Sequence, residues 1–197
     1  MIALEAGVVA AVAEFDRRTF LRVTLLATGM GAWSIGCASN TPTWMTPPPD
    51  QPLQALSPRA YATLTAAGAC IAGPRVAAEI VAGRLRPGPV ADAWLARTPT
   101  LRDPLLQALT VLEFGVYPLM HKLRAFTSLT DTGRDTVLVG LRDGRLGLQR
   151  ALFGGIRSMA LLAVYLTPEA HALVDYPAPF GTDAVTIGDA MAPLPPA

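Results

Sequence analysis

The chain is poor in the residues that most catalytic and metal sites require. It has only two cysteines, two histidines and a single lysine in 197 residues. Two cysteines exclude a disulfide-rich scaffold, and two histidines exclude a histidine-based metal cluster unless many carboxylates converge on it. Charged residues make up 16% of the chain, below the usual fraction of about 25%, which excludes a disordered, highly charged protein.

Positive and negative side chains nearly cancel. Sixteen basic residues face fifteen acidic ones, a net charge of +1. Binding to a phosphate backbone needs an excess of positive charge, so a nucleic-acid partner is excluded. The length allows one domain and hardly two, and 51% of the residues are hydrophobic. With no recognisable active-site motif, the chain is more typical of a partner of an enzyme than of an enzyme.

A basic motif near the N-terminus precedes a run of uncharged residues. Arg17 and Arg18 are followed by Phe20 and Leu21, and residues 23–36 carry no charge. The run is shorter than the ~20 residues that span a bilayer, and the segment resembles a twin-arginine (Tat) signal. An ordinary first helix with adjacent arginines is the alternative. Because the Tat translocase carries folded cargo, we expect export to the periplasm together with a bound partner.

The apolar run ends at Cys37. The sequence Ser34-Ile35-Gly36-Cys37 resembles a lipoprotein cleavage box, although Ser34 stands where leucine is preferred. Cys37 is therefore a candidate for lipidation, and the chain could be anchored to the membrane through that lipid or through an uncleaved signal. The alternative is a signal segment that carries no lipid. We assign residues 1–37 to the signal segment.

Proline dominates the next segment. Residues 40–52 contain five prolines, and proline fixes φ and lacks an N–H donor. Residues 38–55 are therefore predicted to form an extended linker, with the folded domain at residues 56–181. Residues 182–197 are predicted to be an irregular tail.

The remaining pattern is helical throughout. Ser57-Pro58, Asp103-Pro104 and Thr167-Pro168 each combine a capping residue with a proline at the first helical position. The fold class is therefore all-α, an irregular bundle of about six helices. Helices are expected at residues 58–72, 75–85, 90–97, from 104 onward, 131–166 with a break near 143–144, and 168–174. The helix from residue 131 is expected to have its cap near Ser128 or Thr130.

The titratable residues of these helices are expected to be structural. Glu113, beside an apolar stripe, is predicted to pair with Arg150 or Arg157, and the alternative is a general base working with His121. His121 and His171 are expected at helix ends. No catalytic, cofactor-binding or metal residue is predicted.

The helix expected after Asp143 is apolar on two sides. Phe153 and Leu161 lie near a face that also carries Arg150 and Arg157, opposite a leucine stripe. Such a helix is either central in the bundle or covered by another protein, and the sequence leaves both options open.

Several motifs in order point to one family. Residues 56–58 (LSP) begin the domain, residues 150–158 (RALFGGIRS) lead into residues 161–165 (LLAVY), and residues 175–180 (DYPAPF) follow Thr167-Pro168. This order resembles the small-subunit family of gluconate 2-dehydrogenase (subunit 3). The resemblance includes the twin-arginine leader.

The resemblance implies a non-catalytic accessory (small or gamma) subunit. Its partner would be a large FAD-dependent dehydrogenase of the glucose–methanol–choline type, with FAD in that partner and no cofactor in this chain. A cytochrome c subunit is a further partner in this family. Sugars, alcohols or sterols are candidate substrates of the complex. The alternatives are a free-standing exported helical lipoprotein that binds an apolar ligand, and an enzyme using Glu113 with His121.

The partner is expected to cover residues 153–165 and 176–180. Contiguous apolar surface that faces water usually marks a binding site, and interfaces favour aromatic and arginine anchors. The alternative is that the same aromatics close the core of the subunit itself. The predicted anchors are Phe153, Arg157, Tyr165, Tyr176 and Phe180.

Overall fold

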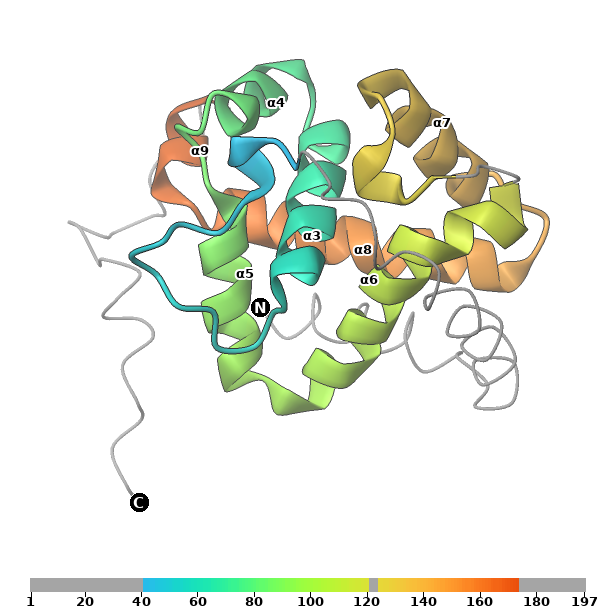
Figure 1. The fold of residues 1–197 in the computed structure, drawn as a ribbon, viewed down its shortest axis with the longest axis horizontal. Coiled ribbons are helices and arrows are strands. Elements are labelled where there is room, and N and C mark those ends of the chain that lie inside the picture. The colour runs from blue at the N-terminus through green and yellow to red at the C-terminus, as the bar shows by residue number, and fades with distance from the viewer. Residues whose placement is uncertain (1–40, 121–123, 174–197) are drawn as a thin grey trace, which may run out of the picture.

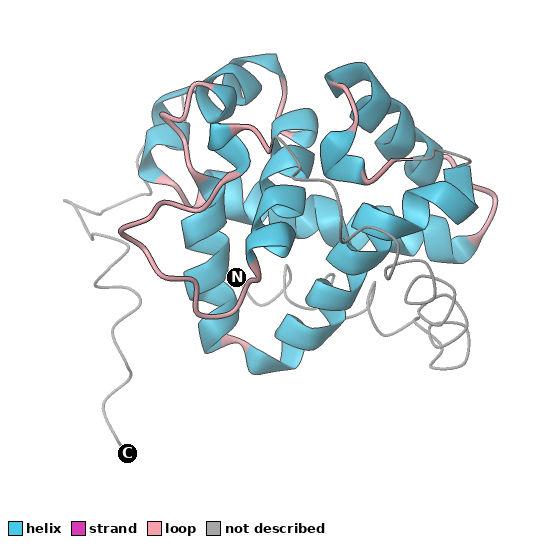
Figure 2. Cartoon of the chain, viewed as in Figure 1, coloured by secondary structure: helices cyan, strands magenta, loops and turns pink. Residues whose placement is uncertain are grey.

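The fold of the described residues is all-α, as predicted. The computed structural model describes residues 41–120 and 124–173, and within them it contains helices and loops without any strand (Figures 1 and 2). Two short 3-10 helices, η1 (Thr43–Met45) and η2 (Phe126–Ser128), join seven α-helices. The α-helices are α3 (Pro58–Ile71), α4 (Pro74–Val81), α5 (Pro87–Arg97), α6 (Pro99–Met120), α7 (Asp131–Arg142), α8 (Gly147–Tyr165) and α9 (Pro168–Leu173).

Two predicted caps begin helices as expected. The Ser57 side chain accepts a hydrogen bond from the backbone N–H of Ala60 at 3.1 Å, ahead of Pro58 at the first position of α3. The Thr130 hydroxyl accepts from the Gly133 N–H at 3.2 Å and starts α7. Each cap satisfies one N–H group that has no partner inside its helix.

Three predicted boundaries were wrong by several residues. Helix α5 begins at Pro87, because prolines in a first turn take away only N–H groups that a helix leaves unpaired. For the same reason α6 can begin at Pro99. Pro104 lies inside this helix. Helix α4 ends early at Val81, because Gly83 has a φ of 73°. The left-handed backbone at this glycine stops the helix.

Helices α3 and α8 organise the packing. Helix α8 crosses behind α3 and contacts α3, α5, α6, α7 and α9 (Figure 1). Every residue of α3 from 61 to 69 is buried, and most are alanine, threonine or glycine. Small side chains let neighbouring backbones come close on all sides. Helix α3 is therefore enclosed on all sides over residues 61–69, whereas α8 buries one face.

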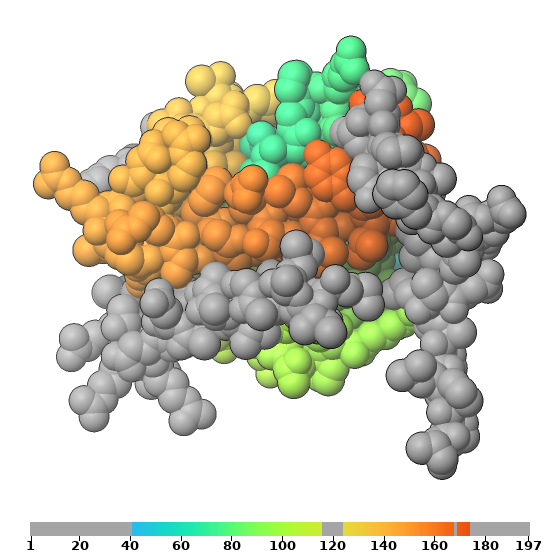
Figure 3. All heavy atoms as spheres, turned by 180° about the vertical axis from the view of Figure 1, so that it is seen from behind, coloured from blue at the N-terminus to red at the C-terminus, as the bar shows by residue number. Residues whose placement is uncertain are grey.

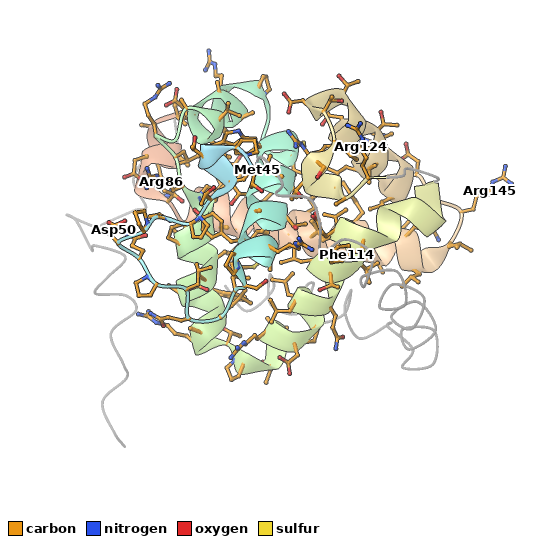
Figure 4. All side chains as sticks on the ribbon, in the orientation of Figure 1. Met45, Asp50, Arg86, Phe114, Arg124 and Arg145 are labelled. Atoms are coloured by element: carbon orange, nitrogen blue, oxygen red, sulfur yellow. The ribbon has the colours of Figure 1, made fainter. Side chains whose placement is uncertain are left out.

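The proline-rich segment belongs partly to the core. Met45 in η1 is fully buried and packs in the same cluster as Leu112 and Phe126, with Trp44 against it (Figure 4 labels Met45). Ala55 is buried as well. An extended linker over residues 38–55 was therefore the wrong prediction for the described part of this segment, because apolar side chains between the prolines anchor it to the bundle.

Candidate functional site

Helix α8 has one buried face and one face on the surface. Its buried residues recur at spacings of three and four, as a helix packed on one side requires. The other side is defined here as the outer face of α8. Figure 3 shows α8 lying across the back of the molecule without another described helix over it. The outer face consists of Arg150, Gly154, Arg157, Ser158, Leu161 and Tyr165, all exposed or partly exposed.

The outer face combines cationic and apolar groups. Residues 147–165 contain no aspartate or glutamate. Arg150 donates to the backbone carbonyls of Gly144 and Arg145, at 2.7 and 3.1 Å. Arg157 is exposed, and no carboxylate of the described residues forms an ion pair with it. The face therefore offers positive charge to an external carboxylate.

Glycine leaves the middle of this face open. A Cβ built on Gly154 would have no atom of a described residue within 4 Å. An approaching chain can therefore come close to the α8 backbone at this point. Glycine inside a helix lowers helix stability relative to alanine, so its presence here suits close contact with another backbone.

The predicted anchors fall into three groups. Phe153 is half-buried and packs against the core, so the alternative of closing the subunit's own core holds for this residue. Arg157 is exposed, and Tyr165 keeps 38% of its surface accessible. Tyr176 and Phe180 lie outside the described residues. The outer face thus unites Arg157 and Tyr165, and Phe153 lies at its edge.

His171 lies at a helix end, as predicted. Its Nε2 donates to the backbone carbonyl of Tyr165 at 2.7 Å, since a carbonyl oxygen can only accept. This bond satisfies a carbonyl in the last turn of α8 and holds α9 against that end. His121 lies outside the described residues.

The predicted ion pair of Glu113 was wrong. Glu113 is 2% exposed, and its carboxylate accepts from the Thr127 hydroxyl at 2.6 Å and the Thr127 N–H at 3.1 Å. The Thr63 hydroxyl lies 3.2 Å from the same carboxylate and shares its proton with a carbonyl of its own helix. Arg150 and Arg157 are on the outer face of α8 instead. Threonine donors inside the bundle take the place of an arginine, and the carboxylate ties α3, α6 and η2 together.

Asp92 is a structural residue that the sequence analysis missed. Its carboxylate accepts from the backbone N–H groups of Gln54, Ala55 and Leu56 at 2.7–2.9 Å. These bonds fix the chain as it enters α3. Asp92 is separated from these three residues by 36 to 38 positions in the sequence. No local sequence signal marks its role, and only the folded structure reveals it.

Burial also changes the acidity of the Cys70 thiol. Burial on α3 raises the pKa of Cys70 to about 12, and the nearby charge of Asp135 acts in the same direction, partly opposed by Arg134. Arg134 is itself buried, with its guanidinium over the Trp44 ring, 5.7 Å from the centroid. A thiol with a raised pKa stays protonated and is a poor nucleophile.

The described residues hold neither a metal-binding cluster nor a membrane-crossing helix. They contain no cluster of three or more His, Cys, Asp or Glu that could hold a metal ion. They also contain no helix with both the length and the apolar character needed to cross a membrane. The signal residues Arg17, Arg18, Phe20 and Leu21, and the lipidation candidate Cys37, lie outside the described residues.

Comparisons with models of protein families, with curated proteins and with solved structures found no match. The resemblance to the small subunits of gluconate 2-dehydrogenase therefore stays a prediction from the sequence.

Proposed function

We propose that this chain is a non-catalytic accessory subunit of a periplasmic FAD-dependent dehydrogenase of the glucose–methanol–choline type. It would carry the Tat signal for both subunits and support the folding and stability of the flavoprotein. The substrate of the complex would be a sugar, an alcohol or a sterol. FAD would bind to the large subunit and not to this chain.

The outer face of α8 is the observation that carries the proposal. It presents Arg157 and Tyr165, residue types that are enriched in protein interfaces, beside a glycine that leaves the helix backbone accessible. The same segment contains two of the motifs whose order carries the family resemblance, residues 150–158 and 161–165. A protein partner that covers this face would bury the apolar groups that the described bundle leaves open.

The internal carboxylates support the same assignment. Glu113 and Asp92 are both buried, and both use their oxygens to hold backbone or hydroxyl donors of neighbouring segments. Their positions are explained by the fold, without any reaction that they would have to perform.

Export of the partner tests the proposal. The double variant Arg17→Lys/Arg18→Lys should leave both this chain and the flavoprotein in the cytoplasm, because Tat recognition depends on the arginine pair. Fractionation followed by a dye-linked dehydrogenase assay locates the complex. The conservative change Arg75→Lys, at an exposed position of α4, is the matched control and should leave export intact. A flavoprotein that still reaches the periplasm with the double variant would disprove shared export.

Purification of the isolated chain provides a second test. The proposal expects no flavin absorbance and no dehydrogenase activity without the large subunit. Bound flavin in the isolated chain would contradict an accessory role and favour the enzyme alternative.

A further inference from the structure

The outer face of α8 places partly exposed apolar side chains beside positive charge. Leu161 and Tyr165 are only partly buried there, beside Arg157 without a carboxylate partner in the described bundle. Arg145, in the loop before α8, also projects away from the bundle (Figure 4). The face and its approach therefore carry positive charge next to apolar surface.

We propose that residues 174–197 of the same chain occupy this face when no partner is bound. This segment contains three aspartates and no basic residue, so its charge is opposite to that of the face. Its apolar residues are interspersed among the aspartates and could pack over Leu161 and Tyr165. The proposal concerns the isolated chain and does not depend on the existence of a flavoprotein partner.

The position of α9 gives the segment a short path to the face. Helix α9 contacts α8, and His171 binds the carbonyl of Tyr165 at the end of the outer face. Leu173, the last described residue before this segment, therefore ends a helix that is held against the end of α8 at Tyr165. Helix α8, with 19 residues, is ~28 Å long. An extended segment of the length of residues 174–197 reaches up to ~80 Å, more than enough to follow the helix back to Arg150.

Charge separates this segment from the other candidate within the chain. Residues 1–40 contain three acidic and three basic side chains, so they have no net attraction for a cationic face. Residues 174–197 carry a net charge of −3. A tethered segment also has a high effective concentration at a site near its point of attachment.

Hydroxyl-radical footprinting of the full-length chain tests the proposal. In the unchanged chain, Leu161 and Tyr165 should be oxidised more slowly than expected from their exposure in the described bundle. Replacing the aspartates (Asp175→Asn/Asp183→Asn/Asp189→Asn) should lower the ratio of docked to released segment about tenfold, since each surface ion pair contributes roughly a two- to threefold factor. Oxidation of both side chains should rise accordingly, and salt should have the same effect.

Reference side chains and charge reversal make the result specific. Val139 on α7 and Val81 on α4 are exposed apolar residues away from this face, and their oxidation should not change. Arg150→Glu/Arg157→Glu should release the segment, and adding Asp175→Arg/Asp183→Arg should restore protection. Circular dichroism detects any variant that fails to fold. In that case the proposal is tested by whether salt raises the oxidation of Leu161 and Tyr165 in the unchanged chain.

Three results would overturn the proposal. The first is equal oxidation of Leu161 and Tyr165 with and without the aspartates. The second is protection that disappears only when residues 1–40 are removed, which would assign the face to the N-terminal segment. The third is protection that appears only in the presence of another protein.

Discussion

The ring of Tyr61 on α3 lies directly against Gly88 on α5. A Cβ atom added at Gly88 would lie 2.1 Å from Cε2 of that ring, well inside van der Waals contact. Tyr61 is fully buried, and a side chain in a close-packed core can shift only by displacing its neighbours. Burial also raises the pKa of the Tyr61 hydroxyl. Contact between α3 and α5 at this point therefore requires glycine.

Gly88→Ala should destabilise the chain. Forcing a methyl group into this contact displaces Tyr61 or separates the two helices, at a cost of about 1–3 kcal/mol. Denaturant unfolding followed by circular dichroism measures the change. Gly154→Ala is the matched control, because the space around its Cβ is open, and it should raise stability by about 0.5–1 kcal/mol. Equal effects of the two substitutions would contradict the close contact at Gly88.

Glu113→Leu should also destabilise the chain. It removes the acceptor of the Thr127 hydroxyl and N–H, and it leaves these half-buried donors without their protein partner. Each buried, unsatisfied group costs about 1–3 kcal/mol. Adding Thr127→Val should recover part of the loss, because it removes one of the orphaned donors. Thr110→Val, at an exposed position of the same helix, should have little effect in the same unfolding experiment.

Cys70 should make stability fall at alkaline pH. The pKa is raised from 9.0 to about 12 in the folded chain, so the unfolded chain releases this proton at lower pH than the folded chain. The stabilising contribution is therefore complete below pH 9 and is lost as the pH rises toward 12. Cys70→Ala should flatten the fall in stability over this window, measured by urea unfolding at a series of pH values. An unchanged pH profile would show that the thiol is not held in its neutral form.

Two changes on the outer face of α8 should weaken binding to the flavoprotein partner that we propose. Gly154→Trp fills the open space at the middle of the face, and Arg157→Glu reverses its exposed charge. Each should reduce affinity about tenfold or more, the loss typical of an important interface residue. Co-purification with the large subunit measures the effect. Val81→Trp, at an exposed position on α4, controls for added bulk and should bind normally.

Binding that persists in both face variants would place the interface elsewhere on the chain. Circular dichroism of the free variants must show the normal helix content, because loss of helix would explain weak binding without any interface.

The sequence by itself determined the local structure where local chemistry decides it. Ser57 before Pro58, and Thr130 three residues before Gly133, define helix starts through hydrogen bonds within a single turn. The spacing of apolar residues identified the helices and the all-α class, because a helix needs only its own backbone bonds and one apolar face. The break between α7 and α8 near Asp143 was likewise visible in the sequence.

Only the tertiary structure decided which partners the polar groups take. Asp92 binds the N–H groups of residues 54–56, and Glu113 binds Thr63 and Thr127, across separations that no local pattern encodes. The packing of Met45 also turned a proline-rich segment into part of the core. The sequence left a choice between a central and a covered helix at residues 147–165. Only the packed structure shows that, among the described residues, α8 buries one face against its neighbours and keeps Arg157 and Tyr165 at the surface.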